Sequence, residues 1–310
     1  MIEAVGVSKY YGARRALSEV SFSIQQGEVV GFLGLTGAGK TTVLKVLCGL
    51  LVPSAGKVTV DGVDGVETPR ELRKRIGFLP DRPPLHPEMT VRQMVAYAAR
   101  LCGLPAERVT ARVGEVLSLC GLADVADDLI EWLSHGYRQR VGIAIAVAHE
   151  PKLVVLDEPI SGLDPAQIVA MRGLIRGLKE KHTVLLSSHI LSEISHTCDR
   201  ILVLHQGRIV AQGNEASLAA GLSAPVEILA RGKVGDAERA DLARLEGVSG
   251  LEVEAAGEGL VRLRARLTSD AAREQLVATL VQRGLGVRSV VDSQTGLESV
   301  FLKLTQGGEA

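Results

Sequence analysis

Short apolar runs alternate with longer amphipathic stretches through the first two thirds of the chain. The runs VVGFLG, LVVLDEP, TVLLSSH and RILVLHQG are rich in β-branched residues and have the length of buried strands. The segment TTVLKVLCGLL, the stretch after Pro165 and the stretch after His189 have helical patterns. Strands that alternate with helices predict a mostly parallel sheet with helices on its faces, an α/β fold.

The pattern changes twice along the chain. Strand signals are missing between Thr90 and about Leu133, where TVRQMVAYAARLCGL opens with Thr90 and Gln93 at capping-box spacing and GEVLSLCGL continues with helical period. We therefore expect a helical subdomain at about 88–150, inserted in a domain that spans 1–220. After it, strand-like and helical segments alternate again and predict a small α/β domain at 221–310.

Composition narrows the function classes. The chain has 310 residues, 46% of them hydrophobic, and a net charge of -1, so it can bury a core but carries no strong electrostatic signature of nucleic-acid binding. We expect no nucleic-acid partner. The first residues do not resemble a signal peptide and no apolar run approaches the roughly 18 residues that span a bilayer, so we expect a cytoplasmic chain. The four cysteines lack metal-site spacing and are expected to be reduced thiols.

The stretch GLTGAGKT matches the phosphate-loop pattern GxxxxGK(S/T) between a predicted strand and a predicted helix. Glycines let backbone N–H groups turn towards phosphate oxygens, Lys40 supplies positive charge, and the Thr41 hydroxyl can bind Mg²⁺. The alternative is a glycine-rich turn that contains a lysine by chance. The predicted strand before it and the predicted helix after it favour a phosphate loop. The predicted nucleotide-binding residues here are Gly34, Leu35, Thr36, Gly37, Ala38, Gly39, Lys40, Thr41 and Thr42.

Two further strand ends carry candidate catalytic groups. LVVLDEP ends in two carboxylates that would be costly to bury without a cation, so Asp157 is predicted to hold Mg²⁺ and Glu158 to be the general base. His189 ends the strand TVLLSSH, and the ends of parallel strands meet at one crevice, which would bring it to the γ-phosphate. Its position is equally consistent with a structural role.

The stretch LSHGYRQR reads as the start of a helix. Ser134 is a natural N-cap, and a helix N-terminus also attracts anions. Taken alone, this pattern favours a plain helix cap.

Together these motifs resemble the ATP-binding subunit of an ABC transporter over about residues 1–220. The phosphate loop, LSHGY, LDEP, SGLDP and SSH appear in the order of that family. The longer string from LSHGY to SGLDP resembles the branch of gliding-motility and multidrug-type export ATPases, many of which carry a small C-terminal domain. The resemblance implies a P-loop NTPase core, ATP and Mg²⁺ as cofactors, ATP hydrolysis, and a homodimer that closes around two Mg-ATP. It also implies integral membrane permease subunits as partners, export as the function, and a place on the cytoplasmic face of the membrane.

The motif match also assigns roles to further residues. Ser134 and Gly136 would contact the γ-phosphate bound by a second copy, and the loop from Ser161 to Asp164 would join the two sites. Tyr11 would stack on adenine, with the adjacent Tyr10 as the alternative. The segment from Gly77 to about Leu104 would receive a cytoplasmic helix of the permease.

Three departures from the family pattern stand out. Asp81 takes the place of a usual Gln that touches Mg²⁺ and relays movement, and it is shorter and adds negative charge. The motif match makes Asp81 a candidate ligand of the nucleotide and of Mg²⁺. The stretch LSHGY occupies the place of the family signature, usually LSGGQ, so His135 and Tyr137 replace its second Gly and its Gln. Ile160 replaces a usual Thr after DEP.

Two other functions are open at this point. An ABC-type ATPase that acts on chromosomes, repair sites or ribosomes usually has long coiled coils, zinc modules or a second cassette, and this sequence shows none of these patterns. A phosphate-loop kinase or switch GTPase would not carry the LSHGY and SSH motifs.

Overall fold

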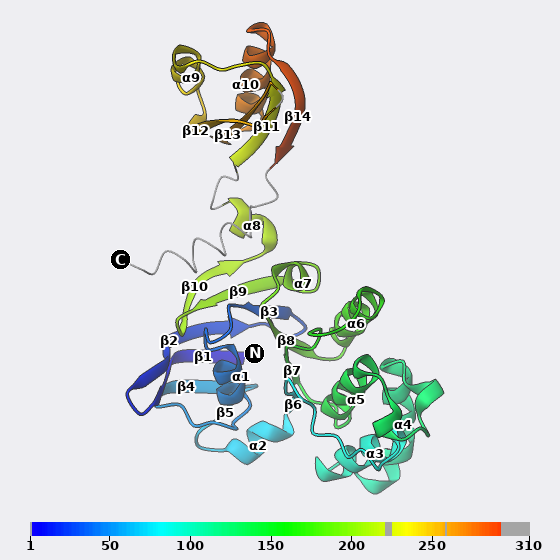
Figure 1. Ribbon diagram of the computed structural model, residues 1–310. Helices are drawn as coiled ribbons and strands as arrows, with labels where there is room; N and C mark the ends of the chain where they lie inside the picture. The colour runs from blue at the N-terminus through cyan, green and yellow to red at the C-terminus, as the bar shows by residue number, and fades with distance from the viewer. Residues whose placement is uncertain (1, 221–224, 258, 293–310) are drawn as a thin grey trace. The chain divides into compact units, whose positions relative to one another are not determined.

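The computed structural model describes residues 2–220, 225–257 and 259–292 (Figure 1). Its contacts divide the chain into two compact units, 1–214 and 215–310. The division falls shortly before the predicted boundary at residue 220. Each unit is described by itself.

A six-stranded sheet forms the centre of the first unit, in the order β10-β9-β3-β8-β7-β6. All neighbours pair in parallel except β10, which lies antiparallel at the edge. The predicted parallel sheet is therefore confirmed, and the carboxyl ends of β3, β7 and β8 lie side by side. The strands are β3 (Val29–Leu33), β6 (Ile76–Leu79), β7 (Leu153–Asp157), β8 (Thr183–Ser188), β9 (Arg200–His205) and β10 (Arg208–Gly213). The helices of this layer are α1 (Lys40–Leu47), α6 (Pro165–Leu178) and α7 (Leu191–Ser195).

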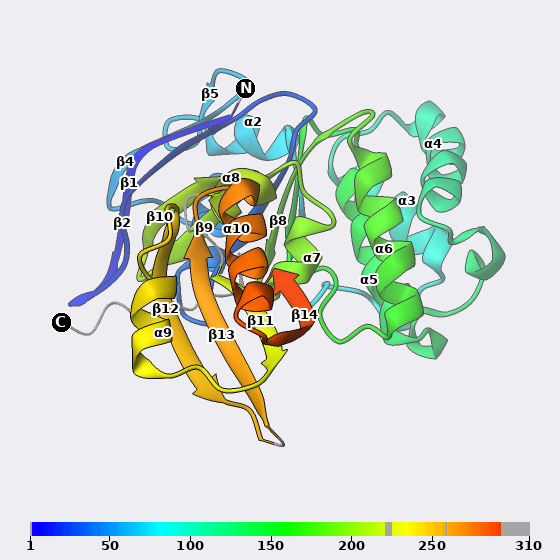
Figure 2. The same ribbon diagram turned by 90° about the horizontal axis from the view of Figure 1, so that it is seen from above.

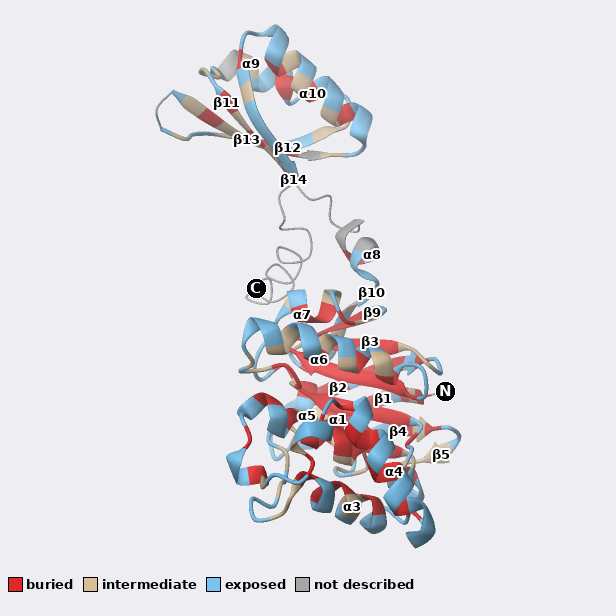
Figure 3. Ribbon diagram, turned by 90° about the vertical axis from the view of Figure 1, so that its right-hand side faces the viewer, coloured by how far each residue is buried: buried red, intermediate tan, exposed pale blue. Residues whose placement is uncertain are grey.

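A second sheet, of four antiparallel strands in the order β2-β1-β4-β5, was not expected from the sequence. Helix α1 contributes apolar side chains, including Leu44 and Leu47, to one core cluster with both sheets, and this cluster is part of the buried interior drawn red in Figure 3. The antiparallel sheet therefore holds the helix that follows the phosphate loop. The elements are β1 (Ile2–Tyr11), β2 (Arg14–Ile24), β4 (Ala55–Val60), β5 (Val63–Asp64) and α2 (Pro69–Lys74).

The predicted helical subdomain follows β6. The capping box predicted at its start is confirmed: the Gln93 N–H donates to Thr90 Oγ1 at 3.2 Å, and the Thr90 N–H donates to Gln93 Oε1 at 2.9 Å. At Gly77 a side chain would collide with the Ala146 carbonyl, so glycine lets the last helix approach the sheet. The helices are α3 (Val91–Leu101), α4 (Ala106–Leu119), η1 (Ala123–Val125), η2 (Ile130–Trp132) and α5 (His135–Val147). Within the described residues, no helix has the length and apolarity of a membrane span.

The second unit confirms the predicted α/β character. After α8 (Glu215–Ala220), a four-stranded antiparallel sheet in the order β12-β13-β11-β14 packs apolar side chains such as Ile228 and Leu263 against Leu276 and Leu280 of α10. The order β-α-β-β-α-β is that of a ferredoxin-like domain. The elements are β11 (Pro225–Arg231), α9 (Asp236–Leu242), β12 (Val248–Ala255), β13 (Leu260–Leu267), α10 (Asp270–Gln282) and β14 (Gly286–Asp292).

Candidate nucleotide site

The phosphate loop connects β3 to α1 and packs closely against the backbone of neighbouring strands. A Cβ atom on Gly34 would lie 2.6 Å from the Leu204 carbonyl oxygen, and one on Gly39 would lie 2.9 Å from the Ala16 carbonyl oxygen. Gly37 and Gly39 have φ values of 85° and 108°, in the region that favours glycine. The Gly207 N–H donates to the Ala38 carbonyl at 2.9 Å. A side chain at Gly34 or Gly39 would collide with a neighbouring carbonyl oxygen, and the positive φ of Gly37 and Gly39 favours glycine. The conformation of the loop therefore requires glycine at these positions.

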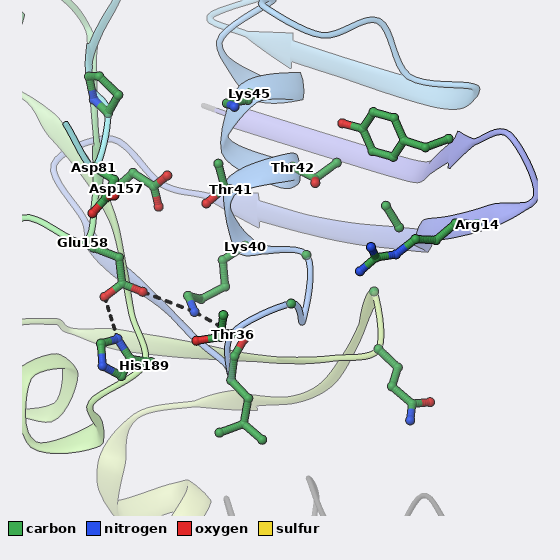
Figure 4. Close-up of a pocket in the computed structure, with 18 of the residues that line it drawn as sticks. Arg14, Thr36, Lys40, Thr41, Thr42, Lys45, Asp81, Asp157, Glu158 and His189 are labelled. Carbon is green, nitrogen blue, oxygen red and sulfur yellow. Dashed lines mark hydrogen bonds and ion pairs between the residues drawn. The ribbon is translucent and has the colours of Figure 1, made fainter. Parts of the chain in front are cut away.

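Lys40 is the first residue of α1 and its side chain is only 7% exposed. Its Nζ donates to the Gly34 carbonyl at 2.7 Å and lies 3.2 Å from Glu158 Oε1 (Figure 4). A buried ammonium group needs partners of this kind. Its positive charge is held over the phosphate loop by the loop backbone and one carboxylate.

Glu158 stands directly after β7 and joins Lys40 to His189. Its Oε2 lies 2.9 Å from His189 Nδ1, while its Oε1 faces Lys40 (Figure 4). Its backbone has φ 50°, a left-handed conformation that is uncommon for a residue with a side chain. The structure thus brings together the three predicted catalytic residues.

Ser187, at the end of β8, is a site residue that the sequence analysis missed. Its hydroxyl donates to Asp157 Oδ1 at 2.6 Å and accepts the Glu158 N–H at 3.0 Å. Both Ser187 and Asp157 are buried. One hydroxyl therefore fixes both acidic residues of LDEP. Ser187 is the first serine of the motif SSH, which the sequence analysis used only for its histidine. Its role follows from the pairing of β7 with β8, which places it beside Asp157.

These groups line a cavity of about 1000 Å³. It takes in twelve of the predicted site residues: Tyr11, Leu35, Thr36, Gly37, Gly39, Lys40, Thr41, Thr42, Asp81, Asp157, Glu158 and His189. The sequence analysis missed further lining residues: Arg14, Arg15, Lys45, Arg82 and Gln206. Four of the missed residues are cationic, and with Lys40 they give the cavity the positive character that a polyphosphate requires.

The two candidate adenine-stacking residues differ in position. Tyr11 lines the cavity at the end of β1, with Lys9 Nζ 5.6 Å from its ring centre, whereas Tyr10 is outside the lining. Both rings are about half exposed.

Five predicted site residues are not in the lining of this cavity: Gly34 and Ala38 belong to the phosphate loop itself, whereas Ser134, Gly136 and Asp164 lie at the starts of α5 and α6. Ser134 caps α5, and its hydroxyl accepts the Tyr137 N–H at 3.3 Å, as predicted for a helix cap. Asp164 caps α6 and accepts the Gln167 N–H at 2.9 Å. Gly136 is buried in the first turn of α5 against the side chain of Gln167. Within one chain, none of the three reaches the phosphate loop's cavity.

Asp81 follows β6 and is exposed at the rim of the cavity. Its backbone carbonyl lies 3.5 Å from Nε2 of Gln139, a buried residue of α5. The loop after β6 thus connects the cavity to the helical subdomain.

Comparison with known proteins identifies the family. Residues 17–161 match the family model described as "ABC transporter". The bacitracin transport ATP-binding protein BcrA of Bacillus licheniformis is 31% identical over 310 residues, which cover 99% of this chain and 98% of BcrA. The chain belongs to the ABC transporter ATP-binding family. This ATP-binding subunit is also 35% identical to the Nod factor export ATP-binding protein I of Rhizobium etli, over 98% of the chain and 93% of that protein.

A solved structure supports the same conclusion. The dimeric ATP-binding cassette MJ0796, in a post-hydrolysis state with ADP and Pi, matches with a TM-score of 0.63 and 27% identity, over 69% of this chain and 98% of that one. The P-loop NTPase fold is therefore confirmed, and the chain is an ATP-binding subunit with ATP hydrolase activity.

The residues of the cavity fit a nucleotide with a divalent cation. Thr41 and Asp157 supply a hydroxyl and a carboxylate on the wall of the cavity, which are ligand types that Mg²⁺ prefers. In the part of the chain that the structure describes, no group of three or more His, Cys, Asp or Glu side chains could hold a metal.

Proposed function

We propose that this ATPase powers export through separate membrane permease subunits and works as two copies on the cytoplasmic face of the membrane. The observation that carries the proposal is the similarity to transport proteins over nearly the whole chain. The relatives named for bacitracin transport and Nod factor export match the second unit as well as the first. A non-transport ABC-type ATPase is not favoured by these relatives.

Glu158 is the proposed general base. Its carboxylate accepts a proton from the attacking water, and His189 and Lys40 hold one carboxylate oxygen each. When phosphates occupy the loop, Lys40 exchanges its contact with Glu158 for phosphate oxygens, which leaves that carboxylate oxygen free to accept the proton. Mg²⁺ bound at Thr41 and Asp157, with Asp81 nearby, would neutralise phosphate charge.

A second copy is proposed to complete each site. Ser134 begins α5 on an exposed surface, and the N-terminus of a helix carries partial positive charge that favours an anion. Ser134, Gly136 and Asp164 cannot serve the cavity of their own chain from where they lie. Contact with a nucleotide held by a partner copy gives all three a role, and the solved MJ0796 cassette is dimeric.

The segment 77–104 is the proposed contact with the permease. It runs from β6, beside the cavity, through a proline-rich loop to α3. Helix α3 exposes two large apolar residues, Tyr97 and Leu101, and the latter is 72% exposed. Because Gln139 of α5 also contacts the start of this loop, a shift at the nucleotide can reach this surface.

The base is tested by Glu158→Gln. The amide keeps the shape of the side chain but cannot accept the proton, so hydrolysis is expected to fall by about 100-fold or more while ATP binding persists. Hydrolysis is measured by phosphate release, binding by a fluorescent ATP analogue, and dimer formation by light scattering. Glu180→Gln, in the exposed turn after α6, is the control. Unchanged turnover contradicts the base assignment.

The export role is tested separately with the wild-type chain in its host. We expect it to sediment with membranes and to co-purify with a protein of several membrane spans. Leu85 and Met89 are partly exposed apolar residues of the proline-rich loop before α3, and the Leu85→Asp/Met89→Asp variant should lose this association while it keeps ATP hydrolysis. A wild-type chain that stays out of the membrane fraction contradicts the transport role.

A further inference from the structure

The first turn of helix α5 contacts the loop between β7 and α6 and the first turn of α6, and Figure 2 shows both helices from above. The ring nitrogen Nε2 of His135 lies 3.1 Å from the Ser161 carbonyl oxygen. A Cβ atom on Gly136, the next residue, would lie 2.7 Å from Oε1 of Gln167, so the helix also packs on the first turn of α6. Two successive residues of the signature thus contact the segment that leaves the catalytic strand.

This contact continues to the catalytic strand. The Ser161 N–H donates to the Glu158 carbonyl at 3.2 Å, and Ser161 itself lines the cavity. The two backbone polar groups of Ser161, which belong to successive peptide units, therefore connect the His135 ring on one side to the Glu158 carbonyl on the other. The Glu158 N–H is held by Ser187 on the other side. Glu158 is thus fixed through both of its backbone polar groups.

The backbone of Glu158 needs such support. With φ at 50° it adopts a left-handed conformation that L-residues with side chains avoid, and this conformation persists only where surrounding contacts impose it. The carbonyl at Ser161 is an acceptor, so the group on α5 must be a donor. The imidazole N–H of His135 supplies one, whereas glycine, the usual residue at this place in the signature, would supply none.

We propose that His135 is a positioning residue for Glu158. It acts through Ser161 within the same chain, and it ties the start of α5 to the base that hydrolyses the ATP of that chain. This inference rests on the proposed role of Glu158. Helix α5 is also the element proposed to contact the partner's nucleotide. His135 therefore links that contact to the position of Glu158 in its own chain.

The first experiment compares His135→Leu with His135→Gln. Leucine removes the donor, so kcat for ATP is expected to fall roughly two- to tenfold, the effect of one hydrogen bond, with KM unchanged because His135 is outside the cavity. The Gln side chain carries an N–H group and should restore most of kcat. His196→Leu is the matched control, since His196 also bonds a backbone carbonyl, that of Ser192, but on α7. Thermal unfolding checks that all variants fold.

Two results would overturn the proposal: equal kcat in wild type and both variants, or a loss that appears in KM instead of kcat. Full activity of Glu158→Gln would contradict the assignment of Glu158 as the base. That result does not depend on the His135 variants, so the two failures can be distinguished.

The second experiment uses mixed dimers in which one chain carries Glu158→Gln, so that hydrolysis comes from the other chain's Glu158. His135→Leu should lower kcat when it is in the chain with the intact Glu158. It should have no effect in the chain with Glu158→Gln. The opposite result would mean that His135 contacts the partner's nucleotide directly, and the proposal would be wrong.

Discussion

At the scale of single residues, motifs predicted most of the cavity wall. Lys40, Asp157, Glu158 and His189 line one cavity as predicted, since their types and places at strand ends determine where they meet. Arg14 and Gln206 were missed for a physical reason. They lie next to turns, after Tyr11 in the β1–β2 hairpin and between β9 and β10, and only the pairing of the strands brings these turns to the phosphate loop.

The two tyrosines allow a direct test of base stacking. Tyr11→Ala is expected to weaken ATP binding, because an aromatic contact is worth about 0.5–1.5 kcal/mol beyond its buried area. Tyr10→Ala, one residue away and outside the cavity lining, is the matched control and should bind ATP like the wild type. Titration with a fluorescent ATP analogue gives both affinities. A larger loss in Tyr10→Ala would assign the stacking role to Tyr10 instead.

At the scale of elements, caps and buried strands were predictable and the antiparallel sheet was not. Thr90 and Ser134 cap their helices as expected because the cap is a local interaction. In β1, buried and exposed residues do not alternate regularly, and its pairing with β2 shifts register between Ala4 and Tyr10. A bulged strand loses the period of two that identifies strands in a sequence.

Two histidines that interact electrostatically lie just outside regular elements: His149 follows α5 and His182 precedes β8. Burial lowers the pKa of His149, and the neighbouring charges of His182 and Arg112 lower it further. Burial also lowers the pKa of His182, with Arg112 and Lys181 adding to the effect. Nδ1 of His182 is 2.6 Å from the Pro151 carbonyl oxygen, an arrangement in which Nδ1–H donates. Neutral imidazoles are therefore part of the folded state.

Acid should weaken this part of the fold. A histidine whose pKa is lowered by folding takes up its proton more readily in the unfolded chain. The free energy of unfolding is therefore maintained above the ordinary histidine pKa of about 6.5 and decreases as the pH falls below it. We expect Tm to drop between pH 7.5 and pH 5.5, and to drop less in His149→Gln/His182→Asn, in which the Asn amide can still donate to Pro151. His86→Gln, at an exposed histidine, is the control. An equal decrease of Tm with pH in the wild type, the double variant and this control would contradict the prediction.

At the scale of the whole molecule, one chain brings the phosphate loop, Glu158 and His189 to one cavity, while the start of α5 lies outside it. The phosphate loop, the base and His189 face one another, while Ser134 and Gly136 lie at the start of α5. The sequence could predict the components because each is local. The prediction that the signature acts at the site of a second copy came from the family resemblance and not from periodicity or spacing.

Complementation tests whether the sites are completed between copies. Ser134→Arg blocks the signature and Lys40→Ala removes the main phosphate charge, so each variant alone should be nearly inactive. A mixed dimer of the two contains one site with Lys40 from the first chain and Ser134 from the second, and it should recover part of the wild-type phosphate release.

Trp132, the one tryptophan of the sequence, is 70% exposed two residues before Ser134 and provides a second signal. Its emission should shift to the blue when ATP closes the Glu158→Gln dimer over the start of α5. Activity in the mixture equal to the sum of its two components, with unchanged Trp132 emission, would mean that each chain hydrolyses ATP without its partner's signature.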